Sequence, residues 1–240
     1  MRIGTKSVLF GAHCFFIHPW FVALGWWKLY GFPWQPWLWV AFLLHDIGYL
    51  GKPNMDGPEG EEHPWTGAHI LYWLQGAWLF LTRYAWKRSE LRRQPIHRLQ
   101  FRRRWAWAHL SLTHERVIWG NEALFHSRYL AKRYGAQPSR LCMADKLAIA
   151  LTPAWLYLPM VRLTGEVREY MAHARHRIEG NEQVSESEKA KLLSGAEYDW
   201  YRGVQEYMVR WVAGHKDGRS DTWTSSARKR ATLNDQGVWR

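Results

Sequence analysis

A histidine and an aspartate stand side by side at the end of an apolar run, and this pair most constrains how the chain can fold. The run Phe42–Leu44 leads into His45 and Asp46, and Gly48 follows in a turn. Burying an imidazole and a carboxylate beside Leu and Phe costs free energy unless another group pairs with them. A divalent cation is the simplest such partner. Taken alone, the pair could instead be a capping aspartate beside a surface histidine.

Apolar residues recur at helical spacing along most of the chain, and no series of strands is evident, so we expect an all-α protein. Pro36 is expected to begin a helix, and Ser139 to cap one. Residues 47–62 are rich in Gly and Pro and predict a loop. The predicted helices cover residues 7–30, 36–46, 64–82, 105–116, 120–134, 139–151, 164–180 and 186–213.

The segment Ser7–Trp27 carries no formal charge and is long enough to cross a membrane. It contains His13, His18 and Pro19, which argue against a span. We therefore expect a buried core helix or a helix that contacts a membrane surface.

The net charge of +12 is concentrated in residues 83–104, where Lys and Arg far outnumber the single acidic residue, Glu90. Aromatic residues interleave with these cations, so the stretch predicts binding of nucleic acid or of an anionic membrane surface. A solvated helical excursion without a partner is the alternative. The arginines proposed for this patch are Arg92, Arg93, Arg102, Arg103 and Arg104.

The chain has only two cysteines, Cys14 and Cys142. This number excludes a disulfide framework and a cage of thiolate ligands, and it fits a reducing compartment. No standard secretory signal is evident. We expect a cytoplasmic protein and leave membrane association open.

Further potential metal ligands lie on or at the ends of apolar helical stretches. They are His18, His63, His126 and Asp145. A helical bundle can direct such side chains into one core cavity. Imidazole and carboxylate ligands suit a divalent transition metal such as Fe, Mn, Zn, Ni or Co, as one or two ions.

Taken in order, these residues resemble the HD-domain superfamily of metal-dependent phosphohydrolases. The resemblance spans about residues 8–152 and rests on the following elements: His18, the run Leu43–Gly48 around His45-Asp46, His63-Pro64 with Gly67-Ala68, and Asp145-Lys146. It implies an HD-domain-like helical bundle over residues 1–165, with a basic helical insertion at 81–116. A C-terminal helical extension over 166–213 would pack on this domain, and we expect residues 214–240 to form a polar, flexible tail.

The resemblance also implies a ligand set. His18, His45, Asp46 and Asp145 would hold a first metal, and His63 and His126 a second, with Asp46 bridging the two. The gap from His63 to His126 is longer than is usual in the family, and an insertion at 81–116 would account for it.

Three alternatives remain open within this ligand set. His13 competes with His18 for the first position, and His69 competes with His63 for the first ligand of the second metal. His114 competes with His126 for its other ligand.

The chemistry implied by the resemblance is hydrolysis of a nucleotide-like phosphate ester through a metal-activated water. Arg128 and Lys146 each adjoin a proposed ligand and are candidates to hold the phosphate, although a solvated face or an ion pair would also explain them. Asp46 is the proposed central catalytic residue. Glu62, beside His63, is a candidate to orient a ligand or to accept a proton.

Two other functions remain open. One branch of the superfamily uses a mixed-valent di-iron pair to oxidise its substrate with O₂, and the same ligand set would suit it. A nucleic-acid-binding protein or a nuclease that uses the Arg-rich stretch is the other.

Overall fold

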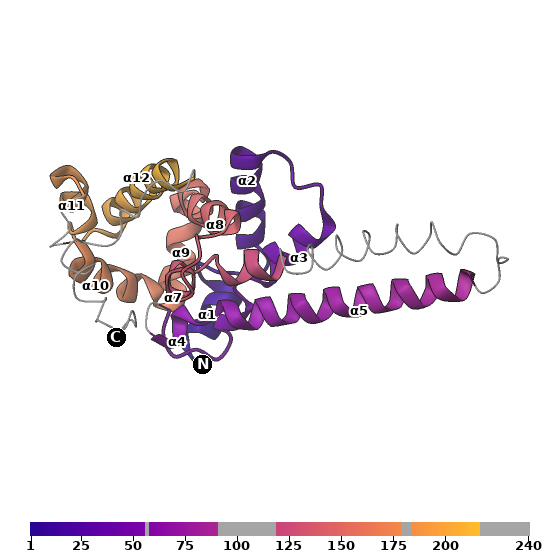
Figure 1. Cartoon of the computed structure of the whole chain (residues 1–240). Helices are drawn as coiled ribbons and strands as arrows, with labels where there is room; N and C mark the ends of the chain where they lie inside the picture. Colours follow the sequence, from indigo (N-terminus) through magenta and orange to yellow (C-terminus); the bar gives the residue numbers. More distant parts are fainter. Residues whose placement is uncertain (56–57, 91–118, 179–183, 217–240) are drawn as a thin grey trace, which may run out of the picture.

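The protein is all-helical in the part of the chain that its computed structural model describes, which is residues 1–55, 58–90, 119–178 and 184–216 (Figure 1). The predicted all-α class is confirmed. The helices are α1 (Ile3–Phe10), α2 (His18–Tyr30), α3 (Pro36–Leu44), a 3₁₀ turn (Ile47–Tyr49), α4 (Pro58–Glu61), α5 (Pro64–Glu90), α7 (Arg128–Arg133), α8 (Arg140–Leu151), α9 (Ala154–Thr164), α10 (Glu166–Ile178), α11 (Glu186–Leu192) and α12 (Glu197–His215). Residues 119–124 are also helical.

Several predicted boundaries match the structure because local signals set them. Pro36 begins α3, and the Ser139 hydroxyl accepts a hydrogen bond from the Cys142 amide at the start of α8. Helix α5 begins at Pro64 as predicted, but it continues to Glu90 rather than ending at 82.

Three predicted helices are each two helices, and one break coincides with a tertiary contact while the other two have local causes. The predicted helix 7–30 divides between α1 and α2, where Glu166 of α10 accepts a hydrogen bond from the Ala12 amide. The predicted helix 120–134 breaks before Ser127, whose hydroxyl caps α7. The predicted helix 186–213 breaks near Gly195, which has a φ of +78°.

Two apolar clusters share helix α8. One packs α2, α3 and α5 around Phe42 and Leu71, and the other packs α9 and α12 around Tyr201 and Trp211. Helix α8 makes its most extensive packing with α2 and α12, so its two faces join the two clusters. Asp145 lies in this central helix and is buried.

Helix α5 extends well beyond the other helices (Figure 1). The Tyr72 hydroxyl, part-way along α5, donates a 2.7 Å hydrogen bond to the Asn121 side chain. This contact joins two residues that are 49 positions apart in the chain, and the insertion at 81–116 stays a prediction. The basic-patch residues Arg92, Arg93, Arg102, Arg103 and Arg104, as well as His114 and the tail from 217, lie outside the described residues.

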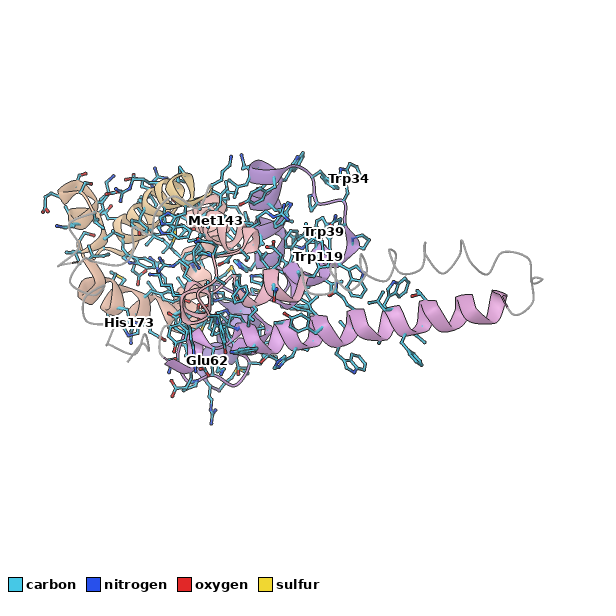
Figure 2. The ribbon with its side chains drawn as sticks, viewed as in Figure 1. Trp34, Trp39, Glu62, Trp119, Met143 and His173 are labelled. Carbon is cyan, nitrogen blue, oxygen red and sulfur yellow. The ribbon has the colours of Figure 1, made fainter. Side chains whose placement is uncertain are left out.

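The apolar segment Ser7–Trp27 is divided between α1 and α2, with Val22 and Trp26 buried and Trp20 and Trp27 exposed. Trp34 in the following loop is 82% exposed and lies at the outer edge of the molecule (Figure 2). Taken singly, none of the helices in the described ranges is both long enough and apolar enough to cross a membrane. Helices α8 and α9 meet that test only as a pair, and the pair is bent by 101°.

Candidate metal centre

All six residues predicted as metal ligands lie together in one buried cluster. Their donor atoms form two groups that share Asp46, and within each group all atoms lie within 4.8 Å of one another. The first group is His18, His45, Asp46 and Asp145, and the second is Asp46, His63 and His126.

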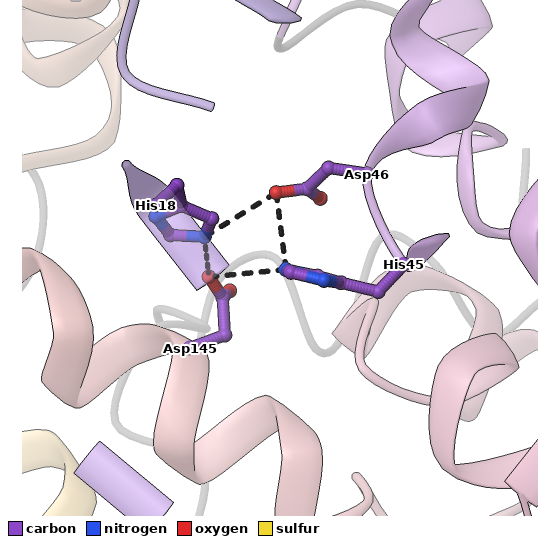
Figure 3. Close-up of side chains that lie close together, drawn as sticks. All are labelled: His18, His45, Asp46 and Asp145. Atoms are coloured by element: carbon purple, nitrogen blue, oxygen red, sulfur yellow. Dashed lines mark hydrogen bonds and ion pairs between the residues drawn. The ribbon is translucent and has the colours of Figure 1, made fainter. Parts of the chain in front are cut away.

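The first group is assembled from three helices (Figure 3). His18 begins α2, Asp145 projects from α8, and His45 and Asp46 follow α3. The His18 Nε2 atom lies 3.0 Å from Asp145 Oδ1 and 3.3 Å from Asp46 Oδ2. The His45 Nε2 atom lies 3.1 Å from the same Asp46 oxygen and 3.9 Å from Asp145 Oδ1.

The second group uses the other oxygen of Asp46. Both His63 Nε2 and His126 Nε2 lie 3.3 Å from Asp46 Oδ1, and 2.9 Å from each other. Each carboxylate oxygen of Asp46 therefore faces a different pair of imidazoles, which is the arrangement that a carboxylate bridging two ions requires.

Backbone carbonyls orient three of the four imidazoles. The Nδ1 atoms of His45, His63 and His126 each bond to the carbonyl oxygen three residues upstream, at 2.9, 2.6 and 2.5 Å respectively. A carbonyl only accepts, so each Nδ1 carries the hydrogen and each Nε2 offers its lone pair in the neutral ring. Metal-bound histidines are typically held by such a bond from the second ring nitrogen.

Two polar atoms in the cluster lack a satisfactory partner. His45 Nε2 and Asp46 Oδ2 are fully buried, and neither makes a hydrogen bond of acceptable geometry to any described residue. Ligands about 2.1 Å from a metal lie about 3.0–3.4 Å from one another. Most of the observed spacings fall in or near this range, so the cluster could hold a metal ion.

The charges of the cluster favour a cation. Burial raises the pKa of Asp46, but the neighbouring imidazoles, His45 foremost, together outweigh burial and hold this pKa well below its usual value. Burial likewise raises the pKa of Asp145, and Lys146 and His18 together lower it well below its usual value. Both carboxyl groups are therefore ionised at neutral pH.

The imidazoles respond to these two carboxylates in different ways. Burial lowers the pKa of His45, but Asp46 and Asp145 outweigh it and raise the pKa to about 10. Burial lowers the pKa of His63 to about 4, against the opposing effect of Asp46. His63 is therefore neutral at pH 7, whereas His45 must release a proton before it can bind a metal.

Two glycines allow the ligand-bearing segments to approach. A Cβ atom on Gly48 would lie 1.9 Å from the His63 carbonyl oxygen, and one on Gly67 would lie 2.2 Å from the Leu44 carbonyl oxygen. Backbone therefore packs on backbone where α3 ends and α5 begins. This contact places the His45-Asp46 pair beside His63.

We expect Gly67→Ala to destabilise the protein by about 1–3 kcal/mol, because the methyl group must displace backbone. Gly214→Ala is a matched control, since nothing lies near its Cβ position in α12 and alanine favours a helix by about 0.5–1 kcal/mol. Urea unfolding followed by circular dichroism measures both changes. Equal midpoints for Gly67→Ala and the parent protein would contradict the close packing.

The structure resolves two of the alternatives among the histidines. His18 lies in the cluster, while His13 lies beside it, with the two ring centroids 5.6 Å apart. His63 lies in the cluster, while His69 is exposed and packs against Trp65.

Glu62 does not orient His63, contrary to the prediction. The Gly60 carbonyl holds the His63 ring, while Glu62 forms an ion pair with Arg133 at 2.9 Å in which both side chains are nearly half exposed. Figure 2 shows Glu62 on the outside of the fold. Proximity in sequence was misleading here because His63 turns inward at the start of α5 and Glu62 turns outward. Its proposed catalytic role gains no support from this position.

Lys146 pairs with a carboxylate of the centre, and Arg128 packs against Trp211. Lys146 Nζ donates to Asp145 Oδ2 at 3.0 Å, and the Arg128 guanidinium lies 5.3 Å from the centroid of the Trp211 ring. Burial lowers the pKa of Lys146, whereas Asp145 raises it. The effect of Asp145 contributes to a net rise in this pKa. The positive charge of Arg128 opposes this rise in the pKa.

The sequence offered no signal for three other residues near the cluster. The Tyr49 ring stacks on His63 with ring centroids 3.7 Å apart, and Ser7 and Glu166 form a buried hydrogen bond beside His13. Ser7 and Glu166 are far apart in the chain, so no spacing rule connects them.

Comparison of the chain with known protein families, curated proteins and solved structures found no match. The resemblance to HD-domain proteins therefore stays a prediction from the sequence, and the structure adds a buried His/Asp cluster that could bind a metal ion.

Proposed function

We propose that this protein is an HD-type, metal-dependent phosphohydrolase that acts on a nucleotide-like phosphate ester. The observation that carries the proposal is the shared position of Asp46, whose two oxygens face two separate pairs of imidazoles. The carbonyl bonds that expose the Nε2 lone pairs support it as well.

Each part of the cluster has a role in this reaction. A divalent metal ion supplies a hydroxide nucleophile near neutral pH and neutralises phosphate charge. Asp46 and Asp145 provide the negative charge that binds such cations, and the four imidazoles complete the ligand set. The ionised state of both carboxyl groups at neutral pH supports these roles.

Arg128 and Lys146 are the proposed phosphate-binding residues. Lys146 uses one of its three donors on Asp145 and keeps two that can reach a ligand. The guanidinium of Arg128 can bind two phosphate oxygens at once. Lys146 lies beside Asp145 of the centre, and Arg128 begins helix α7 two residues after His126.

We expect Arg128→Ala to raise the KM for a phosphate ester about tenfold and to leave metal content unchanged, since one charge-assisted hydrogen bond is worth about 1.5–3 kcal/mol. Arg133→Ala is the matched control, because Arg133 lies on the same helix but pairs with Glu62 at the surface. Steady-state kinetics of both variants test the assignment. Equal KM values for the two variants would remove Arg128 from the binding site.

The proposal as a whole is tested on untagged protein, because a histidine tag would itself bind metal. Metal content is measured first, and the protein is then loaded with Mn, Fe, Co, Ni or Zn. Phosphate release from nucleoside monophosphates and diphosphates, and the conversion of cyclic nucleotides to monophosphates, are followed with and without air. Metal-dependent hydrolysis of any of these substrates supports the hydrolase, and no hydrolysis with any metal contradicts it.

A mixed-valent di-iron oxygenase is the second candidate, because a bridging carboxylate suits a pair of iron ions equally well. Two irons per chain, with turnover that requires O₂ and releases no phosphate, would favour this function. Binding of nucleic acid or of an anionic membrane through residues 83–104, nuclease activity and a cytoplasmic location all stay predictions.

A further inference from the structure

A second buried polar network lies beside the metal centre and is separate from its ligand set. Its centre is Glu166 at the start of α10, which is fully buried and pairs with no cation among the described residues. Glu166 Oε2 accepts hydrogen bonds from Ser7 Oγ at 3.0 Å, the Ala12 amide at 3.2 Å and the Tyr170 hydroxyl at 3.1 Å. Thr164 Oγ1 lies 2.5 Å from the other carboxyl oxygen.

The donors around Glu166 determine which group donates in the hydrogen bond between Ser7 and His13. Three donors converge on Oε2, so this oxygen acts as an acceptor whether or not the opposite oxygen carries a proton. The single hydroxyl hydrogen of Ser7 is thereby directed to Glu166. Ser7 Oγ lies 2.9 Å from His13 Nδ1, so the imidazole must donate in this bond. Nδ1 of His13 therefore carries the hydrogen, and Nε2 offers a lone pair.

The His13 ring faces the metal centre without belonging to it. It packs against the Tyr49 ring with centroids 4.7 Å apart, and it lines a small cavity together with His18, His45 and Asp46. The cavity has a volume of about 10 Å³, close to the space that one water molecule needs. No described residue forms a hydrogen bond with His13 Nε2, so this atom is available to a molecule in the cavity.

We propose that His13 is a substrate-contacting residue whose Nε2 atom accepts a hydrogen bond from the attacking water or from a hydroxyl group of the substrate. Ser7 and Glu166 are positioning residues that hold the His13 ring in the required tautomer. The substrate contact rests on the proposed hydrolase function, whereas the tautomer does not. The carbonyl-bound ligand histidines have the same tautomer when their rings are neutral, but only His13 receives it from a chain of side chains that reaches α10.

The tautomer is tested first, by long-range ¹H–¹⁵N correlation spectra of the histidine rings in untagged protein. His13 is assigned by the signals that disappear in His13→Asn. We expect the Nδ1–H tautomer in the parent protein and a mixture of tautomers in Ser7→Ala. An Nε2–H tautomer in the parent protein would overturn the proposal, whatever reaction the protein catalyses.

Kinetics test the contact itself. The side-chain amide of asparagine at position 13 can take the place of the imidazole Nδ1 atom but cannot reach the place of Nε2. The longer side chain of glutamine brings its amide to the place of Nε2. We expect His13→Asn to lower kcat/KM about tenfold at unchanged metal content, and His13→Gln to recover much of the loss. Equal kinetics of His13→Asn and the parent protein would refute the contact. Loss of metal in His13→Asn would show instead that His13 supports the ligands.

Substrate pairs that differ by one hydroxyl group distinguish the two sources of the hydrogen bond. A change in KM restricted to the hydroxylated substrate identifies a substrate hydroxyl group, and a change in kcat for both substrates identifies the attacking water. Inactivity of the parent protein toward every phosphate ester would count against the proposed function, and the tautomer measurement would still decide the role of Ser7 and Glu166.

Discussion

Replacing Asp46 by alanine is expected to reduce metal content at both sites to less than about a tenth of that of the parent protein and to abolish activity. One oxygen of Asp46 lies within 3.3 Å of His18 and His45, and the other lies 3.3 Å from His63 and His126. A single substitution therefore removes a ligand from each group and half of the carboxylate charge. Loss of one ligand of this kind exceeds the roughly 10–100-fold effect of changes to outer-shell partners.

The measurement is elemental analysis of untagged variants purified in parallel. Asp46→Asn separates charge from shape, because the amide keeps an oxygen but loses the negative charge. Glu62→Gln is the control, since this exposed carboxylate contacts Arg133 and none of the four imidazoles. Circular dichroism establishes that each variant is folded. Full metal content in folded Asp46→Ala would show that the proposed centre does not bind the metal.

Removing the metal is expected to lower the melting temperature by about 10 °C. A ligand present at 1,000 times its dissociation constant stabilises a folded protein by about 4 kcal/mol, and each kcal/mol corresponds to about 2–4 °C for a chain of this size. The ligand residues come from α2, α3, α5, α8 and the segment before α7, so the ion joins helices that are distant in sequence. Thermal melts with and without a chelator measure the change. The chelated Asp46→Ala variant is the control, because a chelator should not shift it.

The same centre predicts how metal affinity depends on pH. The pKa of His45 is about 10 in the metal-free chain, so this imidazole carries a proton at pH 7 that a metal ion must displace. The pKa of His63 is about 4, so His63 binds without releasing a proton. Affinity should therefore rise by up to about tenfold per pH unit between pH 6 and pH 9. Competition with a metal-sensitive dye across this range tests the sign, and affinity that falls as pH rises would contradict it.

The sequence alone predicted the helical class, and its resemblance to HD-domain proteins named the six residues of the cluster while leaving His13, His69 and His114 as alternatives. Each of these residues stands on or beside an apolar helical stretch, and a polar group in such a place needs a buried partner. His45 and Asp46 are neighbours in the chain, so their proximity required no knowledge of the fold. Pro36 and Ser139 are similar cases, because helix starts depend on local backbone chemistry.

Tertiary structure decided which of two nearby histidines faces the centre. His63 immediately precedes α5 and His69 lies on an exposed side of that helix, and the packing of α5 on α3 through Gly67 turns His63 inward. His13 and His18 do not share a helix, because the chain turns between α1 and α2. Periodicity can show that two residues point in different directions, but only packing determines which direction is the interior.

The link from Glu166 through Ser7 to His13 depends on tertiary structure alone. Ser7 is on α1 and Glu166 begins α10. In the sequence, neither residue can be distinguished from a polar residue on the protein surface. Sequence patterns report local backbone preference and the need for burial, and both act over a few residues. Hydrogen bonds between distant helices depend on how those helices dock, which the summed packing of the whole chain determines.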